Sequence, residues 1–275
     1  MNRRSLHLAL GLTLVLVVTG AVLISYLWLP FAPDDTSGSR LAPPGGDHLL
    51  GTDKLGRDLL TQLLIGGRIA LGTALGAVAV GGMLGVSAGL LAGFATRWLD
   101  DAAAVVLDIL IAFPTLLLAM LIVAGTGASL GTAILAIGLA MAAIVARLTR
   151  VLVKQVLERD YITAARVAGI TWPRIVLSHV LPNIAPVLLV NLALQAGLAV
   201  LAEASLSYLG LGTPPPNASW GRMLFEAQAT VLTSPAAAIA PGLALVTLVI
   251  GINLTADGLR DLTDPTRRRT PGRSS

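Results

Sequence analysis

The sequence has no cysteine, and this absence excludes a disulfide scaffold, a thiolate metal site and a cysteine nucleophile. Only two lysines occur, Lys54 and Lys154, and neither follows a glycine. A phosphate-binding P-loop needs a lysine directly after a glycine, so the chain has no such loop of its own. The zinc-binding pattern His-Glu-x-x-His is also absent. We therefore expect no enzyme active site and no catalytic residue.

Charged residues and histidines are scarce as well. Charged residues make up only 12% of the chain, and the three histidines fall in separate segments, which predicts no metal site. The only acidic groups within the apolar runs are Asp108 and, at the edge of a run, Glu203. Ion- or proton-coupled carriers place ionisable groups inside their spans, so this scarcity disfavours a gradient-driven carrier. For Asp108 we expect pairing with a neighbouring group in preference to a proton site.

Hydrophobic residues, by contrast, make up 55% of the chain. Several apolar runs exceed the length of about 18 residues that predicts a membrane-spanning helix. The fold class that we predict is therefore an all-α membrane protein with about six transmembrane helices. The first run is too long for the apolar core of a cleavable signal and lacks an Ala-x-Ala exit, so we interpret it as an anchor. The predicted spans are 6–29, 69–95, 102–124, 130–146, 184–202 and 236–253.

Arginine and lysine predict the orientation of these spans, because cytoplasmic loops carry an excess of both. If the chain starts inside and crosses six times, fourteen of its 19 basic residues fall on the inner side and five on the outer side. This distribution predicts that both termini are cytoplasmic, and it explains the basic pI without a nucleic-acid partner. The predicted segments are a cytoplasmic N-terminus (1–5), a first span (6–29), an extracytoplasmic segment (30–68), a five-helix transmembrane domain (69–264) with a cytoplasmic loop at about 147–182, and a basic C-terminal tail (265–275).

Glycine recurs at every fourth position of the second run, from Gly81 through Gly85 and Gly89 to Gly93. This spacing places small residues along one face of a helix, where a second backbone can approach closely. We predict that the glycine stripe packs against another helix, with no catalytic role.

The predicted cytoplasmic loop contains a short amphipathic helix with an unusually small apolar face. Tyr161, Ala164, Ala165 and Ala168 fall at i, i+3, i+4 and i+7, and Gly169 follows as a typical helix end. A narrow alanine ridge suits insertion into a groove on a partner protein. The alternative is a helix that lies on the bilayer surface, but such a helix would favour leucine, phenylalanine or tryptophan at the alanine positions.

These residues also carry a family resemblance. Thr163-Ala-Ala-x-x-x-Gly169, followed after nine residues by His179-Val-Leu-Pro182, resembles the EAA loop of ABC-importer permeases. Threonine stands at position 163 where the general motif has glutamate, and histidine at 179 where it often has isoleucine; both departures resemble the branch that imports dipeptides, oligopeptides and nickel. The segments Gly51-Thr-Asp-x-x-Gly-Arg-Asp58 and Glu203-Ala-Ser-Leu-Ser-Tyr-Leu-Gly-Leu-Gly212 resemble the second permease subunit of that branch.

The resemblance implies the fold of a type I ABC-importer permease in a prokaryotic plasma (inner) membrane. It implies four kinds of protein partner or ligand: a second homologous permease subunit, two ATP-binding cassette ATPases, an extracytoplasmic substrate-binding protein and a peptide substrate. ATP and Mg would be bound by the ATPases, and no cofactor is expected in this chain. The residues expected to couple the chain to the ATPases are Tyr161, Thr163, Ala164, Ala165, Arg166, Gly169, His179 and Pro182. Gly169 and Pro182 are expected to shape the turns that flank the helix pair.

The substrate is less constrained by the sequence. Nickel would favour imidazole or other polar ligands along the path, and the chain offers few, so we predict peptides in preference to nickel; glutathione and other peptide-like solutes stay open. Asn191 and Gln195 lie four residues apart on one face of the fifth predicted span. They are candidates to line the pathway, with a helix-to-helix hydrogen bond as the alternative role. A gradient-driven carrier and a membrane scaffold remain the alternatives to the permease, although neither explains the spacing of the alanine-faced loop.

Overall fold

The computed structural model describes residues 3–214 and 217–263, so the predicted tail at 265–275 lies outside the described residues. The described part contains no β-strand. Its elements are ten α-helices and one π-helical segment, η1, which connects α7 to α8. The helices are α1 (Arg3–Leu27), α2 (Leu59–Gly93), α3 (Arg97–Ala112), α4 (Thr115–Thr126), α5 (Leu130–Leu157), α6 (Asp160–Val167), α7 (Trp172–Ile175), η1 (Val176–Val180), α8 (Leu181–Tyr208), α9 (Trp220–Ala227) and α10 (Ala236–Thr263). The predicted all-α membrane fold is confirmed.

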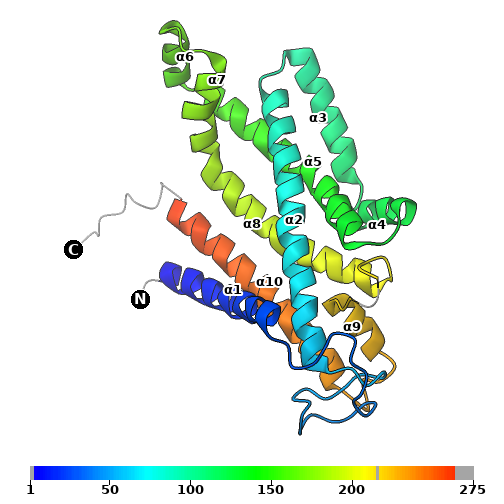
Figure 1. Cartoon of the computed structure of the whole chain (residues 1–275). Coiled ribbons are helices and arrows are strands. Elements are labelled where there is room, and N and C mark those ends of the chain that lie inside the picture. The colour runs from blue at the N-terminus through cyan, green and yellow to red at the C-terminus, as the bar shows by residue number, and fades with distance from the viewer. Residues whose placement is uncertain (1–2, 215–216, 264–275) are drawn as a thin grey trace, which may run out of the picture.

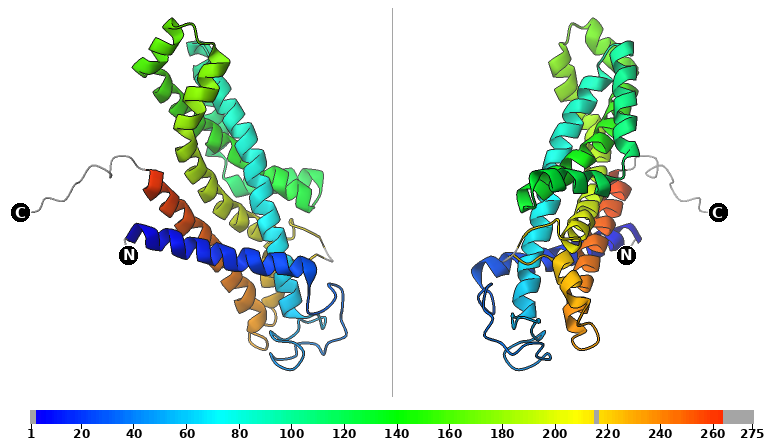
Figure 2. Two further views of the ribbon diagram at one scale, coloured as in Figure 1. Left: turned by 60° about the vertical axis from the view of Figure 1, so that its left-hand side comes forward. Right: turned by 90° about the vertical axis from the view of Figure 1, so that its right-hand side faces the viewer.

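The shortest helices lie at the two ends of a bundle of long helices, whereas α4 projects from its side (Figure 1). Helices α6 and α7 lie at one end, and α9 lies at the other end beside the segment between α1 and α2 (Figure 2). Five long apolar helices can each cross a membrane: Leu6–Leu27, Leu59–Gly93, Leu130–Leu157, Trp172–Tyr208 and Ala236–Leu262. At 1.5 Å per residue, α2 is about 52 Å long, which exceeds a hydrocarbon core of about 30 Å. The bundle therefore extends beyond the membrane.

The glycine stripe of α2 packs against α5, as predicted. A Cβ atom built on Gly85 would lie 2.6 Å from the Cβ atom of Val145, and one on Gly89 would lie 2.5 Å from the carbonyl oxygen of Ala146. The two backbones are thus too close for any side chain at these positions. The stripe contains Gly85-Val-Ser-Ala-Gly89, which has the spacing of a nucleophile elbow, but Ser87 lies in the middle of a helix and not on a strand-to-helix turn.

The third predicted span is not one straight helix. Helices α3 and α4 meet at an angle of 84°. Phe113 between them is extended, with φ −75° and ψ 129°, because the ring of Pro114 disfavours a helical conformation in the preceding residue. The prediction of one continuous span at 102–124 therefore identified an apolar segment correctly, but it missed the bend within that segment.

Helix α3 is held to α5 by ion pairs near the α6 end of the bundle. The buried carboxylate of Asp100 accepts a hydrogen bond from Arg150 Nε at 2.5 Å and a second from Lys154 Nζ. Asp108 pairs with Arg147 at 3.1 Å, and both side chains are more than half exposed. The expectation that Asp108 pairs with a neighbour is confirmed.

Candidate functional site

Helix α6 ends where the sequence predicts. Gly169 has a φ of +80°, which favours glycine. The Gly169 amide donates to the Arg166 carbonyl, and the Ile170 amide donates to the Ala165 carbonyl. These two bonds form a Schellman motif, which satisfies the last carbonyls of the helix and turns the chain back.

The inner face of α6 rests on a buried apolar cluster. Ile162 and Ala165 pack with residues of α5, α7, η1 and α8, among them Val153, Ile175 and Val180. Side chains near the end of α2 pack against the same cluster. Because the cluster joins α6 to three membrane-spanning helices, α6 and the bundle share one packed core at this end.

Aromatic contacts fix α6 from the side. The guanidinium of Arg166 lies 4.7 Å from the centre of the Trp172 ring, a cation–π distance. Trp172 in turn meets Phe94, just after α2, in an edge-to-face arrangement at 5.3 Å between ring centres. Tyr161 and His179 approach with ring centres 6.1 Å apart, so η1 also faces α6. Three of the residues with a predicted role, Tyr161, Arg166 and His179, thus orient α6 within this chain.

The predicted coupling residues divide into an outer and an inner set. An exposed face on α6 includes Tyr161, Thr163, Ala164 and Arg166, and Ala168 and Gly169 are exposed just beyond its end. Ala165 is only 9% exposed and belongs to the buried cluster. Its predicted place on a ridge offered to a partner is therefore wrong, because Ala165 is one of the positions that turn toward the core.

Pro182 does not shape a turn, contrary to the prediction. Helix α7, η1 and α8 form one continuous helical run from Trp172 to Tyr208, and Pro182 lies at the start of α8. Proline has no amide hydrogen, so it removes one backbone hydrogen bond from the preceding turn. That turn adopts the wider π geometry, in which the Leu181 amide donates to the Val176 carbonyl. The proline thus accompanies a local change of helix type within an unbroken helix.

A cavity of about 230 Å³ lies among α4, α5 and α8. Its lining is mainly aliphatic, and Gln195 is one of its few polar members. Asn191, one helical turn away, is not among the lining residues, and its side-chain oxygen is buried without a hydrogen-bond partner. The helix-to-helix hydrogen bond considered for these two amides is not found within the described part of the chain.

At the opposite end of the bundle, the Gly51–Asp58 motif organises the segment between α1 and α2. The Thr52 hydroxyl donates to the Ser39 carbonyl, and Asp58 caps α2 by accepting from the Thr61 amide at 2.7 Å. Gly51 and Gly56 have φ values of +81° and +88°, and a Cβ atom at either position would lie 2.3 Å from a carbonyl oxygen. Each of these residues therefore has a local structural role.

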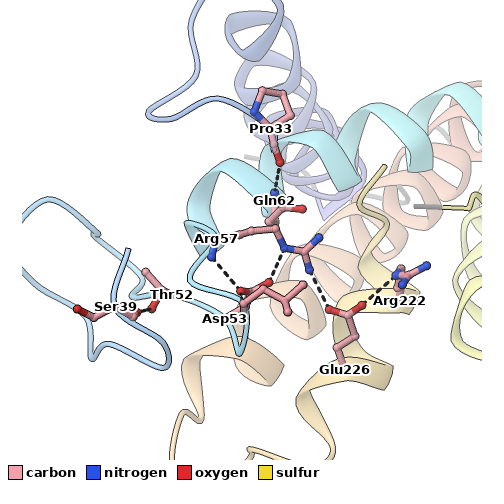
Figure 3. Close-up of polar contacts among 9 residues, drawn as sticks. Pro33, Ser39, Thr52, Asp53, Arg57, Gln62, Arg222 and Glu226 are labelled. Carbon is pink, nitrogen blue, oxygen red and sulfur yellow. Dashed lines mark hydrogen bonds and ion pairs between the residues drawn. The ribbon is translucent and has the colours of Figure 1, made fainter. Parts of the chain in front are cut away.

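An ion-pair network, hereafter the Arg57 network, joins this segment to α9 (Figure 3). Arg57 donates to Asp53 at 2.7 Å and to Glu226 at 3.0 Å. Glu226 also accepts from Arg222 at 2.9 Å. Sequence analysis did not single out Glu226, because it lies 169 residues from Arg57 and no local pattern marks the contact. The available local signals were the four-residue spacings of Asp53 with Arg57 and of Arg222 with Glu226.

Known proteins resemble this chain over most of its length. Residues 81–269 match the family described as binding-protein-dependent transport system inner membrane component. A putative peptide transport system permease protein of Brucella suis is 40% identical over 266 residues, covering 96% of this chain and 89% of that protein. The dipeptide transport system permease protein of Alkalihalophilus pseudofirmus is 37% identical, covering 91% of this chain and 84% of that protein.

The glutathione transport system permease protein of Pectobacterium atrosepticum is 36% identical, covering 96% of this chain and 88% of that protein. Both the family match and these relatives include the helices that carry α6 and the cavity. The multiple apolar helices agree with the membrane location in the family description. The chain therefore belongs to the family of binding-protein-dependent transport system inner membrane components.

Proposed function

We propose that this chain is one permease subunit of an ATP-driven importer of di- or oligopeptides. A second, homologous permease would complete the pathway, two cytoplasmic ATPases would bind ATP and Mg, and an extracytoplasmic binding protein would deliver the peptide. The names of the dipeptide and peptide permease relatives support the substrate class. In this arrangement the α6 end is cytoplasmic, both termini lie on that side, and the α9 end faces the binding protein.

The observation that carries the proposal is the seating of α6. Its outer face presents small side chains such as Ala164, while its inner face is packed into the cluster shared with three spanning helices. We therefore expect a displacement applied to the exposed face to be passed on to the bundle, because Ile162 and Ala165 anchor α6 in this cluster. This is the property needed to carry an ATP-driven motion of a partner into the membrane.

Glutathione is the second candidate substrate, supported by the glutathione permease relative. It contains peptide bonds, so the same pathway chemistry serves it. Nickel is less supported than peptides and glutathione, because the described residues contain no group of three or more histidine or acidic side chains that could hold a metal. Uptake of labelled dipeptide, glutathione and Ni²⁺ by proteoliposomes that contain the complete transporter separates the three.

The coupling role is tested by purification of the complex with an arginine on α6. Ala164→Arg places a long cation on the exposed face without touching the buried cluster, and we expect the ATPase subunits to be lost. Ala229→Arg is the matched control, since Ala229 is an exposed alanine that follows α9, the helix at the opposite end of the bundle (Figure 1). Retention of the ATPases by both variants would contradict the proposed docking on α6.

A further inference from the structure

The cavity among α4, α5 and α8 contains a buried amide that the protein itself leaves without a partner. Gln195 is only 4% exposed, and within the described residues its side chain makes no hydrogen bond. Placing an amide in apolar surroundings is favourable only if its polar atoms find hydrogen-bond partners. Since Gln195 lines the cavity, a molecule that enters the cavity can supply them.

The other polar groups of the cavity differ from Gln195. The Ser205 hydroxyl donates to the Leu201 carbonyl at 2.8 Å, so its hydrogen is already used within α8. Thr115, on α4, is only half-buried. The rest of the lining is aliphatic, for example Ile137, Met141 and Leu198. The cavity therefore offers one buried carboxamide against an apolar wall.

A carboxamide has the same donor and acceptor groups as a peptide bond. Its NH₂ group can donate to a carbonyl oxygen while its oxygen accepts from an N–H group, so one side chain can pair with both polar atoms of a peptide group. Such a pair depends on the backbone of the ligand and not on its side chains. The apolar wall beside it can contact side chains without selecting among them.

We propose that the Gln195 carboxamide binds a peptide group of the translocated substrate, and that the cavity is a subsite for peptides of varied sequence. The inference rests on the proposed function, because it takes peptides as the transported molecules. It adds a recognition residue within the membrane to whatever selection the binding protein makes. A volume of about 230 Å³ is below the range of about 300–1,000 Å³ typical of pockets for whole ligands, so the cavity receives part of the peptide.

The test uses the complete transporter in proteoliposomes with saturating binding protein, and it compares two substrates. One is the dipeptide Ala-Ala, and the other is its ester analogue alanyl-lactate, in which an oxygen replaces the peptide N–H. The wild type should transport Ala-Ala faster than the ester. Gln195→Leu should slow Ala-Ala uptake by roughly the tenfold associated with one hydrogen bond, and it should shrink the difference between the two substrates.

Two controls separate this role from a general effect on the cavity. Ser205→Ala alters the same cavity but removes a hydroxyl already bonded within α8, and Asn191→Leu removes a second unpartnered amide outside it. Both should keep the wild-type preference for the amide. If Gln195→Leu does not assemble with its partners, Gln195→Glu replaces it, since a carboxylate keeps the shape and loses the donor.

The outcomes are distinguishable. An assembled Gln195 variant with the wild-type rate and the wild-type preference would overturn the inference while leaving peptide import intact. A wild-type transporter that moves neither substrate, yet accumulates another solute, would overturn the proposed function instead. Loss of preference confined to the Gln195 variants would support both.

Discussion

Replacement of glycine by alanine at two positions of α2 should change stability in opposite directions. Gly72 and Gly85 lie in the same helix, and alanine is the better helix former at both by about 0.5–1 kcal/mol. A Cβ atom at Gly72 meets nothing within 4 Å, so Gly72→Ala should gain this amount. At Gly85 the new atom would lie 2.6 Å from the Val145 Cβ atom and 2.7 Å from the Ala142 carbonyl oxygen.

The atoms that oppose Gly85→Ala belong to the backbone and to a β carbon, so no side-chain rotation relieves the contact. Helix α5 would have to move away from α2, and overpacking of this kind costs about 1–3 kcal/mol. The propensity gain is common to both variants, so their free energies of unfolding should differ by about 1–3 kcal/mol. Thermal unfolding of each variant in the same detergent measures this difference. Equal stabilisation by both substitutions would refute the close approach of α2 and α5.

Three further predictions concern orientation, the seat of α6 and the ion pairs. The natural chain has no cysteine, so Ala164→Cys and Ala229→Cys each introduce the single thiol of their variant. A membrane-impermeant maleimide applied to spheroplasts should label only the cysteine at position 229. Labelling of only the cysteine at position 164 would show that the chain has the opposite orientation. Ala165→Leu should lower the unfolding temperature because the larger side chain overfills the buried cluster, whereas Ala164→Leu on the exposed face should not. Equal unfolding temperatures of the two variants would contradict the inward position of Ala165. Glu226→Gln should destabilise the chain by about 1–3 kcal/mol because it removes the carboxylate that the largely buried Arg57 shares with the partly exposed Arg222. Asp108→Asn, which breaks an exposed pair, should change the free energy of unfolding by at most about 1 kcal/mol. Chemical denaturation of both variants provides that comparison, and an equal loss in the two would argue against the Arg57 network as a structural link.

The sequence predicted those features that depend on local chemistry. The end of α6 at Gly169 follows from the need for a positive φ, and the packing of the glycine stripe follows from helical spacing. Long apolar runs predicted the five single helices that can cross a membrane, because hydrophobicity and length decide that property, whereas the remaining predicted span is divided between α3 and α4. The 84° bend had a local signal in Pro114, but an average over an apolar run hides one residue.

Other features depend on tertiary contacts that no local pattern encodes. The periodicity of α6 grouped Tyr161, Ala164 and Ala165 on one broad face, yet it could not say which edge of that face turns toward the core. The contact between Arg57 and Glu226 joins segments distant in the sequence. Gln195 was found as a candidate because it is polar in an apolar run, but its lack of a partner emerged only when the surrounding helices were in place.

The unbroken helical run from Trp172 to Tyr208 determines the stiffness of the linkage between α6 and the cavity. His179 beside α6 and Gln195 in the cavity are sixteen residues apart in one helix, about 24 Å at 1.5 Å per residue. A loop between them would absorb a displacement through small changes of φ and ψ. Here two places depart from regular α-helical hydrogen bonding, namely η1, which is five residues long, and Pro186 inside α8, which has no amide hydrogen to donate. We therefore expect a displacement at α6 to reach the cavity through one continuous helix that yields most at these two places.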